Sequence, residues 1–454
     1  FTDMYRLART VLAASGRRLV DGRHRRLWST AASDATAAAT ATATAASRPL
    51  LFLERFALAP VQVTVATGTP SARDRSKSIL AVPVSKSELG SASLASSLGI
   101  DEPTAALLCQ DFDAKADQTA VVYRSASGGS SSSAAAESLE EALASNECRT
   151  PSRVLLVGVA ADSSAPARAG DKEALETLDG TEAAFVQQSR ARAAQASTEA
   201  ALRSSIVAAS AALQRLKAPS AVLPLHRWVT QQQQQQSTAA SATLEPEHAV
   251  RVATQAAALS GYSFSKSLTA PKEANGAIKN EERELELLLP ASLAARRHEL
   301  EHVVHETLTV AQGTLYARDL GNERADVANP DFLESQAQSI AALASDRLSL
   351  SVIRGTSNLE AEGLRMLAAV GQGARWEPRL LVLEYRGGSD GNELVALIGK
   401  GLTFDSGGLN LKPTGSIEEM HMDMCGAAAV LGTIATAARL KLRKNIGMPR
   451  ILQL

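Results

Sequence analysis

The stretch from Val395 to Pro413 reads Val-Ala-Leu-Ile-Gly-Lys-Gly-Leu-Thr-Phe-Asp-Ser-Gly-Gly-Leu-Asn-Leu-Lys-Pro and predicts the local fold most clearly. Its short apolar run ends at Lys400 and is typical of a buried strand, and a glycine-rich loop carrying Asp405 follows. Ligands of α/β proteins bind beyond the carboxyl ends of strands, where these two residues are expected. The glycines allow the loop to turn tightly and to approach a ligand. The stretch therefore predicts an α/β fold with a binding loop at a strand end.

Two more charged residues belong to this candidate site. Lys412 follows in the same loop, and Asp423 lies at the start of an alanine-rich helix expected over Ile417 to Leu440. Paired carboxylates bind hard or borderline divalent cations, and a lysine can join them only when its pKa is lowered enough to lose its proton. From spacing alone, the stretch is also compatible with a phosphate site or a plain turn.

The rest of the chain supports the α/β interpretation. The apolar run from Arg153 to Ala160 predicts a buried strand, and an alanine-rich helix is expected after it. This strand-then-helix order favours a parallel sheet covered by helices. Further elements are expected as helices over Lys172–Lys217, Glu281–Leu315 and Asp331–Ala344, and as strands over Arg379–Tyr385 and Val395–Gly399 around a turn at Gly387–Gly391.

Composition limits the classes of partner. The 454 residues carry 47 Lys and Arg against 48 Asp and Glu, so the formal net charge is −1 and gives no electrostatic argument for nucleic acid or an acidic membrane surface. No stretch approaches about 18 uninterrupted apolar residues, so we expect no transmembrane helix. The three cysteines (Cys109, Cys148 and Cys425) are too scattered for a disulfide framework, which favours a reducing compartment.

The N-terminal segment differs from the rest of the chain. Residues 1–33 contain seven arginines and two acidic residues, and residues 31–47 are almost entirely Ala and Thr. An arginine-rich, acid-poor start is typical of an organelle transit segment, and a basic tail that does not fold is the alternative interpretation. A serine-rich tract at 128–136 and the glutamine run 231–236 predict inserted surface loops.

The strongest signal is a resemblance to the leucyl (cytosol) aminopeptidases. Their signature, close to V-G-K-G-x-T-F-D-S-G-G-x-x-x-K-P followed by Y-D-M-x-G-A-A-A-V, is similar to this chain from Leu397 to Gly432. The similarity extends upstream to Tyr316, and around Arg153 to Ala160 it is weaker. The resemblance implies two α/β domains, the first of them macro-like, and assembly into a homo-hexamer.

The resemblance also implies an activity and a set of site residues. The family consists of metallo-aminopeptidases that release N-terminal, leucine-like residues from peptides. The positions matching Lys400, Asp405 and Asp423 ligate two divalent ions (Zn, Mn or Mg), and the position matching Lys412 stabilises the oxyanion. We expect peptide substrates, no nucleic acid or membrane partner, and a cytoplasmic location, with a mitochondrion or plastid-like organelle as the alternative.

One family block is not found in these residues. The family completes its metal sites with a downstream Asn-Thr-Asp-Ala-Glu-Gly-Arg-like run, which this sequence does not contain. We therefore expect a C-terminally truncated peptidase domain, with Gly447 to Leu454 as an unrelated tail. The alternative function is a catalytically inactive family member with a structural or assembly role.

These observations give a domain plan. We expect an N-terminal extension over residues 1–48 and an α/β domain with low-complexity insertions over 49–279. A helical connector over 280–315 and a metallo-aminopeptidase domain over 316–454, incomplete at its C-terminus, are expected to follow.

Three other candidates are weaker. His298 to His302 fits the H-E-x-x-H pattern of zinc peptidases, but its charged neighbours are typical of a solvated helix with i,i+4 pairs. His421 is expected near the site or on the surface, and Cys425 is expected to be a small buried packing residue.

Overall fold

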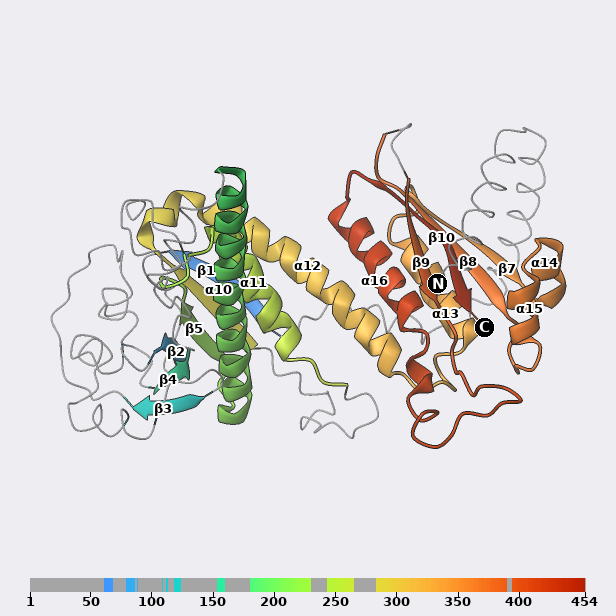
Figure 1. The fold of residues 1–454 in the computed structure, drawn as a ribbon, viewed down its shortest axis with the longest axis horizontal. Coiled ribbons are helices and arrows are strands. Elements are labelled where there is room, and N and C mark those ends of the chain that lie inside the picture. The colour runs from blue at the N-terminus through green and yellow to red at the C-terminus, as the bar shows by residue number, and fades with distance from the viewer. Residues whose placement is uncertain are drawn as a thin grey trace, which may run out of the picture. The chain divides into compact units, whose positions relative to one another are not determined.

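The computed structural model contains two β-sheets, each packed with helices (Figure 1). The expected transit segment, the serine-rich tract and the glutamine run lie outside the residues that the structure describes. The described residues are 61–67, 79–85, 88, 108, 112, 118–123, 153–159, 180–229, 243–264, 283–389 and 394–453. The α/β prediction is confirmed, whereas the four domain ranges stay predictions.

The first sheet is parallel except for one edge strand. In spatial order its strands are β1 (Val61–Thr67), β6 (Arg283–Leu289), β5 (Ser220–Pro224), β2 (Ile79–Val84), β4 (Arg153–Gly158) and β3 (Thr119–Tyr123). Only β3 runs antiparallel to its neighbour. The apolar run from Arg153 is confirmed as a strand, and its side chains from Val154 to Val157 are fully buried.

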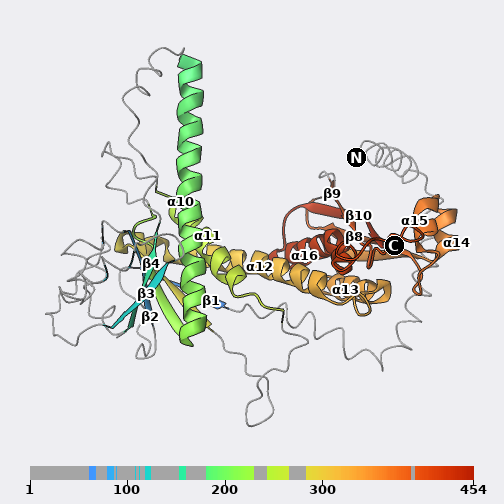
Figure 2. The ribbon, with the colours of Figure 1, turned by 60° about the horizontal axis from the view of Figure 1, so that its bottom comes forward.

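Three helices pack on one face of this sheet. They are α10 (Gly180–Leu216), α11 (Pro246–Ser260) and α12 (Arg297–Asn322), and α12 follows a short 3₁₀ helix, η1 (Ala291–Arg296). Together they form one apolar core with β1, β6, β5, β2 and β4. The expected helix over Lys172–Lys217 is confirmed from Gly180 onward. Figure 2 shows its N-terminal half extending away from the sheet, and residues 191–197 are accordingly exposed.

The expected helix over Glu281–Leu315 is wrong in its first part. Residues Arg283 to Leu289 form β6, which pairs in parallel with both β1 and β5. Glu and Leu favour helices, but in the order Glu284-Leu-Glu-Leu they alternate with period two and so fit a strand. Pairing between two strands overrides the helical propensity here, and the helix begins only after Pro290.

A partly buried ion pair joins the residues that follow β2 and β5. Arg227 Nη1 donates to Glu88 Oε2 at 2.6 Å, and the backbone N–H and the hydroxyl of Ser85 donate to the same oxygen at 2.7 and 2.6 Å. Burial raises the pKa of the Glu88 carboxyl, but the Arg227 charge and the Ser85 hydrogen bonds outweigh it and hold the pKa below its usual value. The carboxylate is therefore the favoured form in the folded chain.

We predict that this ion pair makes stability depend on acidic pH. The folded-state pKa of Glu88 lies below 4.5, so its contribution is complete at neutral pH and is lost as the pH falls through the folded-state pKa. The difference in melting temperature between the wild type and Glu88→Gln is expected to shrink below that pH. Thermal melts of both proteins at neutral and acidic pH measure it, and a constant difference would contradict the prediction.

The second sheet has the spatial order β7, β8, β10 and β9. Its strands are β7 (Leu348–Arg354), β8 (Arg379–Arg386), β10 (Asn445–Gln453) and β9 (Leu394–Lys400). It packs against α13 (Pro330–Ala342) and α16 (Cys425–Leu440), and the short helices α14 (Thr356–Ala361) and α15 (Arg365–Gly371) lie beside β7 and β8. The strands predicted over Arg379–Tyr385 and Val395–Gly399 and the helix after Pro330 are confirmed, with the Asn329 side chain capping the helix.

Two predictions for the C-terminal part are wrong. Gly447 to Leu454 was expected to be an unrelated tail, but Asn445 to Gln453 form β10, between β8 and β9. Pro449 lies where the strand pairing shifts register, which breaks the apolar alternation that would reveal a strand. The helix expected from Ile417 begins only at Cys425, because turns and the 3₁₀ helix η2 (Met420–Met422) occupy the preceding residues.

The C-terminal half of α12 packs closely on α16 through glycine. A Cβ at Gly313 would lie 2.9 Å from the Gly432 carbonyl oxygen and 2.0 Å from Thr436 Oγ1. Arg439 Nη1 on α16 also donates to Gln312 Oε1 at 3.2 Å. Of the helices described, none has the length and apolar character needed to cross a membrane.

Candidate active site

The predicted site residues lie together at the carboxyl end of β9. Lys400 Nζ lies 2.9 Å from Asp423 Oδ2, and Lys412 Nζ lies 2.8 Å from Asp405 Oδ2. The positive charge of Lys400 also contributes to lowering the pKa of Asp405, so the two ion pairs interact electrostatically. Two ammonium groups and two carboxylates therefore lie together as two ion pairs around one strand end.

A glycine contact between β9 and α16 brings Lys400 and Asp423 together. A Cβ at Gly399 would lie 2.4 Å from the Gly426 carbonyl oxygen. A Cβ at Gly426 would lie 2.8 Å from the backbone nitrogen of Lys400. Any larger residue would force the two backbones apart. Because Asp423 comes two residues before α16, this close approach places its carboxylate beside the end of the strand.

The loop after β9 is held by its own polar groups. Gly407 N donates to Asp405 Oδ1 at 2.9 Å, and the Lys412 backbone N–H donates to the Ser406 carbonyl oxygen at 2.9 Å. Gly407 has φ +87°, and a Cβ there would lie 2.4 Å from the Asn410 carbonyl oxygen, so the turn requires glycine. The loop thereby returns the chain so that Lys412 faces Asp405.

These contacts set the charge state of Asp405. The hydrogen bond from Lys412 is the main cause that holds the pKa of the Asp405 carboxyl below its usual value, and the Gly407 N–H and the Lys400 charge add to it. The carboxylate is thus ionised across the neutral range. Lys412 Nζ additionally lies 3.2 Å from Met420 Sδ, which helps fix the direction of the ammonium group.

The donor set fits a divalent cation in part. Asp423 Oδ2 is shielded from solvent and receives no hydrogen bond in the structure, although the Lys400 ammonium is close. A shielded oxygen without a hydrogen bond is an acceptor that a cation would satisfy. Within the described ranges, however, no cluster of three or more His, Cys, Asp or Glu side chains could hold a metal. Asp405, Asp423 and Lys400 could therefore hold a cation only as part of a larger ligand set.

The weaker sequence candidates lie outside this arrangement or differ from expectation. His298 and His302 are exposed on α12, where His302 lies 3.3 Å from Glu306 and Arg297 lies 2.9 Å from Glu301. These pairs agree with a solvated helix face.

The buried role expected for Cys425 is wrong. Its side chain is exposed at the start of α16, and the neighbouring Met424 is the buried one. Burial of part of the thiol and the Asp423 charge raise the pKa of Cys425. His421 is partly exposed, with Nδ1 3.4 Å from the Glu418 carbonyl oxygen, and it makes no contact with Asp423 that the structure records.

Sequence reasoning missed two features of this site. The backbone contact between Gly399 and Gly426 was not foreseen, although both glycines lie in the quoted motif and glycine at both ends of a contact signals close approach. The contact of Met420 with Lys412 was also missed, and a lone methionine in a loop gives no signal for it.

Residues 315–450 match the model of the cytosol aminopeptidase family, catalytic domain, and all four site residues fall inside this range. A probable cytosol aminopeptidase of Acidithiobacillus ferrooxidans is 40% identical over 164 residues, which are 36% of this chain and 32% of that protein. One of Chromohalobacter salexigens is 46% identical over 138 residues, 30% of this chain and 27% of that protein.

Solved structures agree on the fold. A mutant of tomato leucine aminopeptidase superposes with a TM-score of 0.55 at 17% identity, covering 87% of this chain and 62% of that one. The leucyl aminopeptidase of Trypanosoma cruzi superposes with a TM-score of 0.50 at 22% identity, covering 88% and 64%. At this identity the likeness defines the fold, a two-domain α/β architecture of the leucine aminopeptidase type.

The sequence match agrees with the resemblance. Residues 315–450 are similar to the catalytic domain of the cytosol aminopeptidase family, as the motif around Lys400 and Asp423 predicted. The matched segment spans about a third of the length of such relatives, 32% for the protein of Acidithiobacillus ferrooxidans.

Proposed function

We propose that this chain provides catalytic groups of a metal-dependent aminopeptidase that releases leucine-like N-terminal residues from peptides. The observation that carries the proposal is the convergence of Lys400, Asp405, Lys412 and Asp423 at the end of β9. These residues lie within the segment that matches the catalytic domain of the family. Such an arrangement of carboxylates and ammonium groups suits hydrolysis of a peptide bond at neutral pH.

The residues have separate roles in this proposal. Asp405, Asp423 and Lys400 would hold divalent ions, of which the family resemblance implies two (Zn, Mn or Mg). When bound, such ions polarise the scissile carbonyl and lower the pKa of a water molecule. Lys412 places a fixed ammonium where negative charge develops on the carbonyl oxygen. Asp405 orients that ammonium, since the two groups lie 2.8 Å apart.

The remaining family properties are part of the same proposal. We infer peptide substrates, a homo-hexameric assembly and a cytoplasmic location from the resemblance, with an organelle as the alternative location. The near-neutral charge balance, −1 in total, supports the absence of a nucleic-acid partner.

An activity assay on the purified chain tests the proposal. We expect hydrolysis of leucine p-nitroanilide in the presence of Mn²⁺, with loss of the activity on chelation and its return when Mn²⁺ is restored. Asp423→Asn is expected to abolish it, because the substitution removes the charge of the shielded carboxylate. Glu418→Gln is the matched control, since Glu418 is exposed and outside the four-residue arrangement.

The same assay separates the alternative function. A folded, Mn²⁺-supplied chain without hydrolysis would contradict the catalytic proposal and favour a structural or assembly role. Activity that survives both chelation and Asp423→Asn would contradict the assignment of the site.

A further inference from the structure

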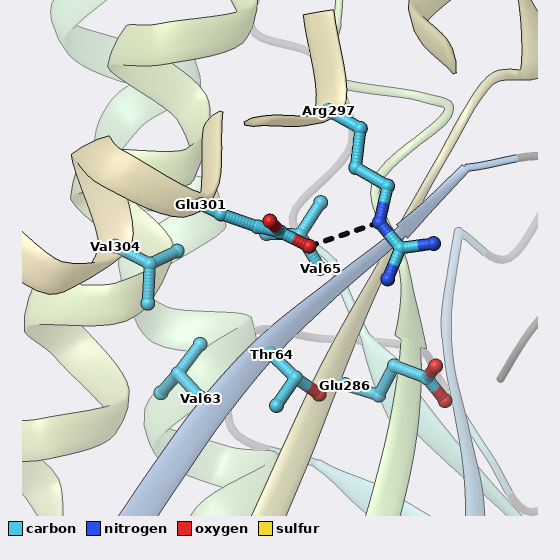
Figure 3. Close-up of a pocket in the computed structure, with 7 residues that line it drawn as sticks. All are labelled: Val63, Thr64, Val65, Glu286, Arg297, Glu301 and Val304. Atoms are coloured by element: carbon cyan, nitrogen blue, oxygen red, sulfur yellow. Dashed lines mark hydrogen bonds and ion pairs between the residues drawn. The ribbon is translucent and has the colours of Figure 1, made fainter. Parts of the chain in front are cut away.

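A pocket of about 310 Å³ is lined by residues of β1, β6 and the first turns of α12 (Figure 3). Its valine side chains belong to the apolar core of the first sheet. Figure 3 shows Arg297 paired with Glu301 at 2.9 Å, and Glu286 also has an interaction partner. Because the apolar wall is packed and the charged groups have partners, the pocket gives no argument for a ligand. A chemically reactive group lies instead at the candidate active site, beside Lys412.

This group is the sulfur atom of Met420. Lys412 Nζ lies 3.2 Å from Met420 Sδ and 2.8 Å from Asp405 Oδ2. Met420 is also the first residue of η2, and its carbonyl oxygen accepts the backbone N–H of Asp423 at 3.4 Å. Met420 therefore contacts two of the four site residues, Lys412 through its side chain and Asp423 through its backbone.

The two acceptors of the Lys412 ammonium differ in strength. An ammonium group has three N–H donors, and here one points to the Asp405 carboxylate and one to the Met420 thioether. In the proposed reaction the third would face the carbonyl oxygen of the substrate. A carboxylate is a strong acceptor, whereas a thioether is a weak one. The position of Nζ therefore depends on an acceptor whose strength chemical modification can change.

Methionine changes in this way when it is oxidised to the sulfoxide. A lone pair of the sulfur attacks one oxygen of hydrogen peroxide, and the O–O bond breaks. The hydroxide that leaves takes up the proton of the transferred oxygen and departs as water. The sulfur is oxidised by two electrons and the peroxide is reduced. The product carries a polar oxygen that accepts hydrogen bonds strongly, and its sulfur no longer acts as the acceptor.

The exposure of Met420 allows this reaction. Met420 is partly exposed, so a small, uncharged oxidant can reach it. Met424, four residues further along, is fully buried. Met366 on α15 is 77% exposed and lies outside the four-residue arrangement. The chain thus contains its own controls, one methionine that is shielded and one that is accessible but remote from Lys412 in the sequence.

We propose that Met420 is a site of reversible oxidation by hydrogen peroxide, and that its sulfoxide moves the Lys412 ammonium out of its active position. The ammonium follows the sulfoxide oxygen, which does not lie where the sulfur lies. Reduction of the sulfoxide restores the thioether and the original contact. The effect on catalysis rests on the proposed aminopeptidase function, whereas the modification and the movement of Lys412 do not.

Peptide mapping by mass spectrometry tests where the oxidation occurs. After brief treatment of the full chain with hydrogen peroxide, we expect Met420 and Met366 to gain one oxygen each and Met424 to remain unmodified. Oxidation of Met366 without oxidation of Met420 would overturn the proposal.

Activity after removal of the peroxide tests the consequence. The oxidised wild type is expected to lose about 10–100-fold in kcat for leucine p-nitroanilide, because a small displacement of a catalytic group is costly, and to recover it with methionine sulfoxide reductases A and B. Met366→Leu should be equally sensitive. Met420→Leu should keep its own untreated activity, and it retains Cys425, so a loss caused by that thiol would appear in this variant too. Met420→Gln, which carries an amide oxygen in place of the sulfoxide, should be slow without peroxide.

Nuclear magnetic resonance (NMR) separates this proposal from the proposed function. In a chain with ¹³C-labelled lysine, the Lys412 Cε resonance is assigned with Lys412→Arg. We expect peroxide to shift it in the wild type and not in Met420→Leu. This measurement needs no catalysis, so an untreated chain without activity would contradict the aminopeptidase proposal alone. An unmoved Lys412 resonance in a chain oxidised at Met420, or equal loss of activity in the wild type and Met420→Leu, would overturn the role of Met420.

Discussion

Replacing Glu334 with glutamine is expected to lower the free energy of unfolding of the second sheet by about 3 kcal/mol. Glu334 lies on α13 and is 4% exposed, and its Oε2 accepts from Nη1 of the buried Arg379 at 2.6 Å. Arg354 on β7 contacts its other carboxylate oxygen. Glutamine keeps the shape of the side chain but removes the charge, so the Arg379 guanidinium stays buried without its main counter-charge.

The matched control is Asp331→Asn. Asp331 also contacts Arg379, at 2.5 Å, but its side chain is 63% exposed, and solvent-exposed ion pairs contribute less than about 1 kcal/mol. Urea unfolding followed by circular dichroism measures both variants, and amide exchange in β8 shows whether the loss is local. If Glu334→Gln costs no more than Asp331→Asn, the buried charge does not stabilise this sheet as argued.

The parts of the fold that local patterns define were predicted correctly. The apolar runs at Arg153 and Arg379 form strands because each run is long enough to be buried within its own sheet. Asn329 followed by Pro330 begins α13, since the asparagine side chain accepts the Phe332 N–H at 3.0 Å. In these places, the information for the element lies within a few residues of it.

Elements that depend on distant pairing were not predicted. β6 is rich in helix-forming residues, and its pairing with β1 and β5 overrides that helical propensity. β10 is interrupted by Pro449, and only β8 and β9 on either side explain its conformation. A propensity argument considers neighbours in sequence, whereas these two strands are determined by neighbours in space.

In the candidate site, too, the local sequence pattern was predicted and the contacts between distant segments were not. Lys400, Asp405, Lys412 and Asp423 were selected from the sequence, and they lie together in the structure as two ion pairs. Which lysine faces which carboxylate could not be predicted, because it depends on how β9 and α16 approach each other. That approach is set by backbone contact at Gly426, and a one-dimensional motif does not show which glycines touch.

Replacing Lys412 with methionine is expected to lower kcat for leucine p-nitroanilide by 10²–10³-fold, an effect of roughly 3 kcal/mol, with little change in KM. This prediction depends on the proposed aminopeptidase activity. Methionine keeps most of the length and the apolar stem of the side chain, so the substitution removes mainly the ammonium group. Since that group is proposed to act on charge that develops during the reaction, its loss affects the rate more than substrate binding.

The position of Lys412 allows its effect on the reaction rate to be separated from an effect on Mn²⁺ binding. Its ammonium lies 2.8 Å from Asp405, so it competes with any cation for that carboxylate. Lys412→Met is therefore expected to bind Mn²⁺ at least as tightly as the wild type in calorimetric titration, although it is slower in catalysis. Lys412→Arg keeps the positive charge and should retain more activity than the methionine variant. Parallel losses of Mn²⁺ affinity and rate in Lys412→Met would mean that Lys412 supports the cation site, and an unchanged kcat would remove it from catalysis altogether.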